Sequence, residues 1–246
     1  QADQYSPFPM EDASSDFEVL ALSQKDPDTL DVLLVATRTE NVDQRQAAVE
    51  AGGLGARIVD VEAFALENAC RLLKHQMPDG GMGHNVAVVD FGASSTTFSV
   101  LRDLRVIYTR DFAFGGQLLT EEIMRTYGMS LEEAGKAKKA GGLPANYEPE
   151  VLEPFIDDMS QQVSRSLQFF LASGSGREQP DQILVCGGCA NITGVADVIG
   201  SRVGIPTEIG NPLGEMKLSS RAKSQGVMRD ATALLTACGL ALRSFD

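Results

Sequence analysis

The sequence predicts a mixed α/β fold in which helices cover a sheet. Short β-rich runs alternate with helical patterns along the chain of 246 residues. The runs NVAVVDFG (85–92) and QILVCGG (182–188) have the character of buried strands that each break at glycine. The longest helical pattern, over 150–174, places an apolar stripe on one side, as a helix does when it packs against a core.

The first sixty residues predict a β-β-α-β unit. Strands are expected over 16–22, 31–37 and 56–62. Between the second and third strands, residues 40–53 predict a helix, and Gly52 and Gly53 supply its stop. A second helix over 63–76 and a Gly- and Pro-rich linker over 77–84 follow this unit.

The middle of the chain predicts three antiparallel strands and then three helices. The strands fall within residues 85–116, with tight turns between them. The helices are expected over 117–128, 130–142 and 150–174. Ser130 opens the second helix with Glu133 three residues later, which is the pattern of a capping box.

The last third of the chain returns to alternating strands and helices. We expect a strand over 182–188, a helix over 192–204, a short strand within 205–214 and a last helix over 230–245. The last helix is apolar and rich in small residues, so we expect it to pack inside the fold.

Composition excludes several classes of function. The net charge of −13 argues against a protein that binds nucleic acid through phosphate contacts, because such proteins cluster Lys and Arg. No apolar run approaches the ~18 residues of a membrane-spanning helix. The pair Cys186 and Cys189 suggests zinc, but there is no second such pair, and His75 and His84 are the only histidines. The sequence therefore does not specify a four-ligand zinc site.

An Asp-x-Gly turn follows the predicted strand at 85–91. Gly92 allows a ligand to approach the backbone, and the amides of the turn GASSTT can bind an anion without a cationic side chain. Asp90 would then hold Mg²⁺ or its waters, and the ion would supply the positive charge that the turn lacks. An ordinary hairpin turn explains the same residues, and the motif alone leaves both interpretations open.

Two glycine pairs and one charged pair add to this hypothesis. Gly115 and Gly116 directly precede a predicted helix, where a phosphate can bind, and Gly187 and Gly188 follow a buried strand. Glu133 and Lys136, on one helical face, could hold ribose hydroxyls. Each feature also has an ordinary explanation: glycine pairs often cap helices, and Glu133 is explained by the capping box.

The order of these elements resembles the second half of the actin-like ATPase superfamily. Within it, the chain is most similar to the PilM family of type IV pilus assembly, whose relative is the division protein FtsA. The stretches that carry this resemblance include DVLLVATRTENVDQRQAAVEAGG, VDVEAFALENA, YTRDFAFGGQLLTEEIMRTYGMSLEEAGKAKKAGG and ILVCGGCANITG. The resemblance implies an actin-like (ribonuclease H-like) fold that is incomplete at the N-terminus, because the family's first Asp-x-Gly hairpin has no counterpart here.

The resemblance also implies a division into subdomains and a set of site residues. The expected divisions are a small inserted subdomain (1–60), a connecting helix and linker (61–83), a nucleotide-binding subdomain (84–119 and 180–217), a helical cap (120–179) and a second connecting helix (218–246). The implied nucleotide-binding residues are Asp90, Gly92, Ser94, Gly115, Gly116, Glu133, Lys136, Gly187 and Gly188, with Asp90 also the Mg²⁺ ligand. Glu62 occupies the place of the residue that orients the attacking water in relatives, although Ala63 replaces the proline that follows it in several of them.

By this resemblance the cofactors are ATP and Mg²⁺, and any hydrolysis is slow. The implied partner is the cytoplasmic N-terminal peptide of the inner-membrane protein PilN, which would place this protein in the cytoplasm at that membrane. Two other functions stay open: a phosphotransferase of the same superfamily and a filament-forming protein like FtsA. Rapid transfer of phosphate to a small molecule would favour the first, and sedimenting polymers the second.

Overall fold

The structure is a computed structural model that describes residues 9–23, 28–174, 178–217, 219 and 225–243. Residues 244 and 245, the end of the last predicted helix (230–245), lie outside the described residues. The chain divides into two compact units, residues 1–60 and 61–246.

The first unit contains one antiparallel strand pair and one helix. Strands β1 (Ala13–Leu22) and β2 (Leu30–Arg38) are aligned so that Phe17 lies opposite Leu34 and Val19 opposite Val32. Helix α1 (Thr39–Ala51) follows β2 directly and ends at Gly52. These elements confirm the first two predicted strands and the first helix. None of the described residues in this unit is buried, so the unit has no core of its own among them.

The predicted strand over 56–62 is wrong. Residues 54–61 have no regular secondary structure, and Glu62 is already the first residue of a helix. A strand needs a neighbour for its backbone hydrogen bonds. Among the described residues, no strand pairs with this segment, so its alternating apolar pattern alone does not make it a strand.

The second unit is built on a five-stranded sheet of order β5-β4-β3-β6-β7. Its strands are β3 (Asn85–Phe91), β4 (Thr96–Arg102), β5 (Arg105–Phe112), β6 (Gln182–Gly187) and β7 (Thr207–Ile209). Strands β3, β4 and β5 form the predicted antiparallel meander. Strand β6 runs parallel to both β3 and β7, so the sheet is mixed.

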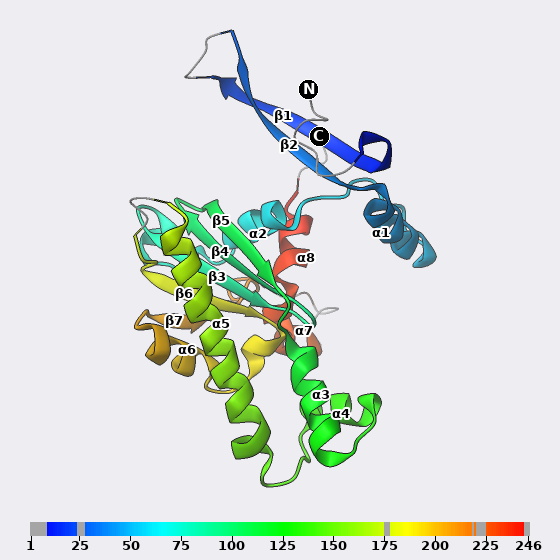
Figure 1. The fold of residues 1–246 in the computed structure, drawn as a ribbon, viewed down its shortest axis with the longest axis vertical. Coiled ribbons are helices and arrows are strands. Elements are labelled where there is room, and N and C mark those ends of the chain that lie inside the picture. The colour runs from blue at the N-terminus through cyan, green and yellow to red at the C-terminus, as the bar shows by residue number, and fades with distance from the viewer. Residues whose placement is uncertain (1–8, 24–27, 175–177, 218, 220–224, 244–246) are drawn as a thin grey trace. The chain divides into compact units, whose positions relative to one another are not determined.

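The two faces of this sheet bury different helices, as Figure 1 shows. Because side chains alternate along a strand, Ala87, Val89 and Phe91 of β3 face a core built with α3, α5 and α6. Val86 and Val88 face the opposite way, into a second core with α2 and α8. Asp90 shares the parity of Val88, so its side chain belongs to the α2 and α8 side.

Every helix predicted for this unit forms, and one further short helix, at residues 225–229, was not predicted. Their bounds are α2 (Glu62–Cys70), α3 (Gly116–Tyr127), α4 (Leu131–Ala140), α5 (Glu153–Ala172), α6 (Val195–Val203), α7 (Gln225–Arg229) and α8 (Leu235–Ala241), joined by the short 3-10 turns η3 (Lys74–Gln76), η4 (Pro78–Gly81), η6 (Gly188–Asn191) and η7 (Ala231–Leu234) and, before α5, by η5 (Glu148–Leu152), a turn of π-helix. The capping box of α4 is present, with Ser130 and Glu133 bonded reciprocally.

Two predicted helices are shorter than expected because tertiary contacts interrupt them. The helix over 63–76 ends at Cys70, and the side chain of Gln76 instead donates to the carbonyl of Ile209 (2.8 Å) and accepts from the amide of Asn211 (2.9 Å). The helix over 230–245 begins only at Leu235. The preceding η7 turn directs Thr232 to the carbonyl of Gly187.

Candidate functional site

The carboxyl ends of strands β3 and β6 meet at one edge of the sheet. Because the two strands are parallel, Asp90 lies beside Cys186 and Phe91 lies beside Gly187. Both strands break at glycine immediately afterwards, β3 into the hairpin loop 92–95 and β6 into η6. This edge therefore brings together the Asp-x-Gly turn and the second glycine pair, which are far apart in the sequence.

Asp90 is a partly buried carboxylate at this edge. Burial, and secondly the nearby carboxylate of Glu62, raise the pKa of Asp90 to about 6. Glu62 is the first residue of α2, so the helix start brings the residue predicted to orient water close to the residue predicted to hold the metal. Because burial and a second carboxylate disfavour the ionised form of Asp90, a cation bound at this place would be stabilised.

Gly187 packs against the end of β3 too closely for any side chain. It has φ of +86°, and a Cβ built there would lie 2.2 Å from the carbonyl oxygen of Phe91 and 2.5 Å from Oδ1 of Asp90. Gly188 differs: it is exposed, and a Cβ there would meet nothing within 4 Å. The first glycine therefore fits β6 against β3, and the second leaves open space above the backbone.

The hairpin loop after β3 contacts the start of α3. The amide of Gly116 donates to the carbonyl of Gly92 (3.0 Å), and the amide of Gln117 donates to the carbonyl of Ala93 (2.8 Å). A Cβ at Gly115 would lie 2.4 Å from the carbonyl oxygen of Ala93. The first glycine pair thus permits a close loop–helix contact. The sequence interpretation needed free amides at the start of α3 to bind a phosphate, but the amides of Gly116 and Gln117 already donate to the loop.

The exposed tip of the same loop has amides that are free within the described part of the chain. Gly92 donates to the carbonyl of Ser95 (3.0 Å) and closes the turn. Ala93 and Ser94 are exposed, and among the described residues no group accepts a hydrogen bond from their amides. If this edge binds an anion, these loop amides offer the hydrogen bonds that the α3 terminus does not.

Glu133 and Lys136 take part in local contacts on α4. The carboxylate of Glu133 accepts from the amide (2.8 Å) and the hydroxyl (2.7 Å) of Ser130. Lys136 donates to Glu132 at 2.6 Å on the exposed surface. Buried Ala134 marks the inner face of α4. Lys136 lies two positions further, about 200° around the helix, so it is directed away from that face, and the described contacts do not join it to Asp90.

Lys138, which the sequence interpretation missed, reaches the start of α3. Its Nζ donates to the carbonyl of Gly116 (2.8 Å) and to Oγ1 of Thr120 (2.6 Å), and burial lowers its pKa. A Cβ at Gly116 would have Sγ of Cys189 and Nζ of Lys138 at 3.1 and 3.7 Å. The signal was present in the sequence, because Lys138 is four residues after Ala134 and therefore on the same helical face.

A magnesium ion at this edge would rely on few protein ligands. Among the described residues, no group of three or more His, Cys, Asp or Glu side chains could hold a metal. This agrees with the chemistry of Mg²⁺, which commonly uses one or two carboxylates together with phosphate oxygens and waters. Asp90 supplies one carboxylate, and the carboxylate of Glu62 is near enough to affect its ionisation, so the residues fit a magnesium ion that arrives with a phosphate ligand.

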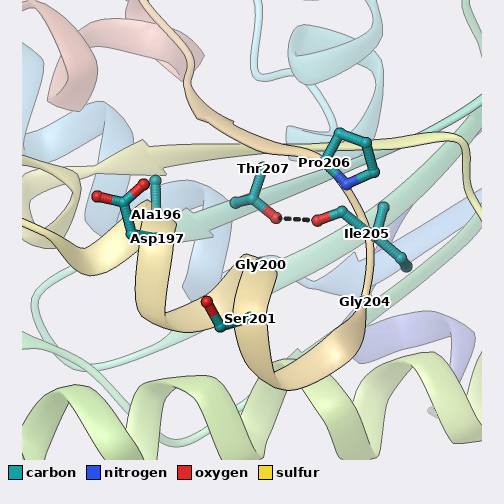
Figure 2. A pocket seen from close by; sticks show the side chains of 8 residues that line it. All are labelled: Ala196, Asp197, Gly200, Ser201, Gly204, Ile205, Pro206 and Thr207. Atoms are coloured by element: carbon teal, nitrogen blue, oxygen red, sulfur yellow. Dashed lines mark hydrogen bonds between the residues drawn. The ribbon is translucent and has the colours of Figure 1, made fainter.

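A hollow of ≈ 370 Å³ lies elsewhere in the second unit, on α6 and the segment that leads to β7. Figure 2 shows its lining, where Oγ1 of Thr207 donates to the carbonyl of Ile205 (2.9 Å). The polar side chains of Asp197, Ser201 and Thr207 line it. None of the residues predicted for nucleotide binding does, so this hollow is separate from the β3–β6 edge.

Known structures with the same fold define the class of protein. The chain resembles EutJ, an ethanolamine utilization protein of Carboxydothermus hydrogenoformans (20% identity, TM-score 0.58, 85% of this chain and 62% of that one). It also resembles MreB5 of Spiroplasma citri, solved with ADP (14% identity, TM-score 0.54, 84% and 65%). The fold is that of the actin-like ATPases, as predicted.

Within that class, the family is also established. The family model described as type IV pilus assembly protein PilM matches residues 1–245, so the chain belongs to this family. The structure of a PilM-PilN type IV pilus biogenesis complex resembles it with 27% identity and a TM-score of 0.77, over 98% of this chain and 69% of that one. These findings confirm the resemblance seen in the sequence.

A curated relative from cell division matches a smaller part of the chain. The chain is 27% identical over 179 residues to the cell division protein FtsA of Agrobacterium fabrum, which covers 63% of this chain and 39% of FtsA. The chain therefore spans well under half the length of that relative. Separately, no helix in the described residues has the length and apolar character needed to cross a membrane.

Proposed function

We propose that this chain is an ATP-binding scaffold protein of type IV pilus assembly, with Mg-ATP bound at the β3–β6 edge. The observation that carries the proposal is that Asp90 lies close both to the carboxylate of Glu62 and to Gly187. An acidic group with a raised pKa, a second carboxylate and exposed loop amides at one sheet edge suit a magnesium-bound phosphate. Membership in the PilM family and the actin-like fold support the choice of nucleotide.

Each residue at the edge has a defined task in this proposal. Asp90 holds the magnesium ion, directly or through water, and the amides of Ala93 and Ser94 bind phosphate oxygens. The open space above Gly188 accepts the flat base, which a larger side chain would displace. Lys138 lies beside Gly116, where its positive charge attracts the nucleotide. Glu133 and Lys136 remain candidates for the ribose, although their described contacts are local.

Hydrolysis at this site would be slow. Glu62 is the candidate for orienting the attacking water, because its carboxylate is close enough to Asp90 to affect its ionisation. Phosphoryl transfer is accelerated mainly by positive groups that stabilise charge on the transferred phosphate. Among the described contacts, Lys138 is the one lysine near the edge. Because a single lysine stabilises little of the charge on a transferred phosphate, the site suits a nucleotide-dependent switch better than an enzyme with rapid turnover.

The proposed partner is the cytoplasmic N-terminal peptide of PilN. The support is the similarity to a PilM-PilN complex over 98% of this chain. Binding to an inner-membrane partner would hold the protein at the cytoplasmic side of that membrane. Residues 1–60 are proposed as the small inserted subdomain, 61–83 and 218–246 as the connecting segments, 84–119 with 180–217 as the nucleotide-binding subdomain, and 120–179 as the helical cap.

Calorimetric titration with Mg-ATP tests the nucleotide site. We expect Asp90→Asn to weaken binding at least tenfold while the protein stays folded, because the amide cannot bind the cation as a carboxylate does. Asp158→Asn is the matched control, since Asp158 is an exposed aspartate on α5. Equal affinity in the two variants would remove Asp90 from the site. Absence of any binding by the unmodified chain would reject the nucleotide proposal.

A second titration tests the partner. A synthetic peptide with the sequence of the PilN cytoplasmic N-terminus is titrated into the chain, with a scrambled peptide as the control. We expect saturable binding of the native peptide only. If the scrambled peptide binds equally well, the interaction is not sequence-specific and the proposed partner is wrong.

A further inference from the structure

Thr232 bonds to the glycine loop of the candidate site from a distant part of the chain. It lies in the η7 turn, it is 6% exposed, and its Oγ1 donates to the carbonyl of Gly187 at 2.9 Å. Gly187 is the last residue of β6 and is buried. No motif in the sequence marked Thr232 as part of a site, because the contact spans 45 residues.

This hydrogen bond fixes the peptide unit that joins the two glycines. The peptide group is planar, so holding the carbonyl of Gly187 also fixes the position of the Gly188 amide. Glycine has more backbone freedom than other residues, and two glycines in succession would otherwise make this turn loose. Without the hydroxyl, the carbonyl of Gly187 would lose this hydrogen bond and the loop would gain conformations.

The other end of the same segment is anchored on α2. The η7 turn leads directly into α8, and a Cβ on Gly239 of α8 would lie 1.7 Å from the carbonyl oxygen of Ala65 of α2. The two helices lie side by side in Figure 1, and Leu235 shares a buried cluster with Leu66 and Ala69. Since α2 begins at Glu62, this segment touches both the loop and the helix that carry candidate site residues.

We propose that Thr232 is a positioning residue for the nucleotide site, which holds the Gly187–Gly188 loop beside Asp90 and connects that loop to the α2–α8 helix pair. The part of this inference that concerns nucleotide binding rests on the proposed function. Its structural part, the ordering of the loop by the hydroxyl, does not depend on any ligand. The two parts can therefore be measured separately.

Two variants separate the hydroxyl from the shape of the side chain. Thr232→Val keeps the branched shape and removes the donor, and Thr232→Ser keeps the donor and removes a methyl group. We expect Thr232→Val to weaken Mg-ATP binding about tenfold, which is the scale of one lost hydrogen bond. Thr232→Ser should retain most of the affinity, and this rescue by the conservative variant distinguishes positioning from packing.

Alkylation of cysteine reports on the loop without nucleotide. Cys189 directly follows the two glycines, is 5% exposed, and burial raises the pKa of its thiol to about 11, so it should react slowly with iodoacetamide. Cys238 on α8 is more exposed and serves as an internal reference. Mass spectrometry of the labelled peptides should show Cys189 reacting several times faster, relative to Cys238, in Thr232→Val but not in Thr232→Ser.

Each outcome decides the proposal. Faster Cys189 labelling and weaker binding in Thr232→Val alone support it. Unchanged labelling in Thr232→Val overturns it, as does an equal effect of Val and Ser. A parallel rise at Cys189 and Cys238 with a lower melting temperature means general destabilisation and also overturns it. If even the unmodified chain fails to bind Mg-ATP, the proposed function fails, and the labelling ratio still decides whether Thr232 orders the loop.

Discussion

Asp90, at the end of β3, is partly buried and close to Glu62, at the start of α2, and burial together with this second carboxylate raises the pKa of Asp90 to about 6. The two residues are 28 positions apart in the sequence. The chain thus maintains an unfavourable acidic pair at a sheet edge, which a bound cation would relieve. The first two predictions follow from this relationship.

The stability of the unliganded chain should fall as the pH rises through the Asp90 titration. The pKa of Asp90 is raised from 3.8 to about 6, so between these values the folded state binds more protons than the unfolded state. The unfolding free energy should therefore be higher below pH 4 and decrease up to about pH 6. Asp90→Asn should remove this contribution, on the order of 1–3 kcal/mol. Urea unfolding of both proteins from pH 4 to 7 measures it, and a constant difference between them would contradict the prediction.

The affinity for Mg-ATP should depend on pH in the opposite direction. Protonation of Asp90 competes with the cation, so binding should weaken below about pH 6 and reach a plateau above pH 7. Calorimetry at pH 5, 6, 7 and 8 checks this. Glu62→Gln should lower the pH at which the affinity for Mg-ATP is half of its plateau value, because it removes the carboxylate that helps to raise the Asp90 pKa. A midpoint that is the same in Glu62→Gln would show that burial alone sets the titration.

The two neighbouring glycines should respond differently to substitution. Gly187→Ala should destabilise the protein by roughly 2 kcal/mol or more, because the φ of +86° and the contacts with Phe91 and Asp90 exclude a Cβ. Gly188→Val should leave the melting temperature nearly unchanged and block nucleotide binding, since its side chain would enter open space where the base is proposed to lie. Thermal unfolding and calorimetry measure both, and normal nucleotide affinity in Gly188→Val would mean that the base lies elsewhere.

Two lysines on α4 provide a matched pair. Lys138→Met should weaken Mg-ATP binding severalfold, because Lys138 is the lysine that reaches the carbonyl of Gly116. Lys136→Met removes the same charge from the exposed side of the helix, where Lys136 pairs with Glu132, and should have little effect. Titration with Mg-ATP compares them directly. A larger loss in Lys136→Met would contradict this prediction and would favour Lys136, the ribose candidate, over Lys138.

Sequence alone predicted those parts of the fold that depend on local pattern. The buried strands 85–91 and 182–187 ended in glycine where expected, and the capping box of Ser130 and Glu133 fixed the start of α4. The strand expected over 56–62 depended instead on a neighbouring strand, and local residues carry no information about that partner. In the same way, Gln76 and Thr232 lie outside the helices predicted for them, because their side chains bond to residues far along the chain.

The candidate site divides in a similar way. Asp90 and the second glycine pair could be proposed from the local sequence, because an Asp-x-Gly turn and a Gly-Gly turn after buried strands restrict the chemistry that fits. The role of Gly115 and Gly116 in the contact between the hairpin loop and α3 could not be predicted from the sequence. It depends on which loop carbonyls accept hydrogen bonds from the α3 amides. The sequence interpretation named Glu133 and Lys136 because they lie three residues apart on one helical face. That Ala134 is the buried residue of α4, which places Lys138 on the inner face, is known only from the structure.

Two helical glycines should have opposite effects on stability. Gly239→Ala should lower the unfolding free energy by about 3 kcal/mol or more, because its Cβ would lie 1.7 Å from the carbonyl oxygen of Ala65 and would force α8 away from α2. Gly135→Ala in α4 meets nothing within 4 Å and should raise stability by roughly 0.5–1 kcal/mol, the helix propensity of alanine over glycine. Urea unfolding of the two variants measures both. If Gly239→Ala were tolerated as well as Gly135→Ala, the close crossing of α2 and α8 would be wrong, and with it the link from Thr232 to the helix of Glu62.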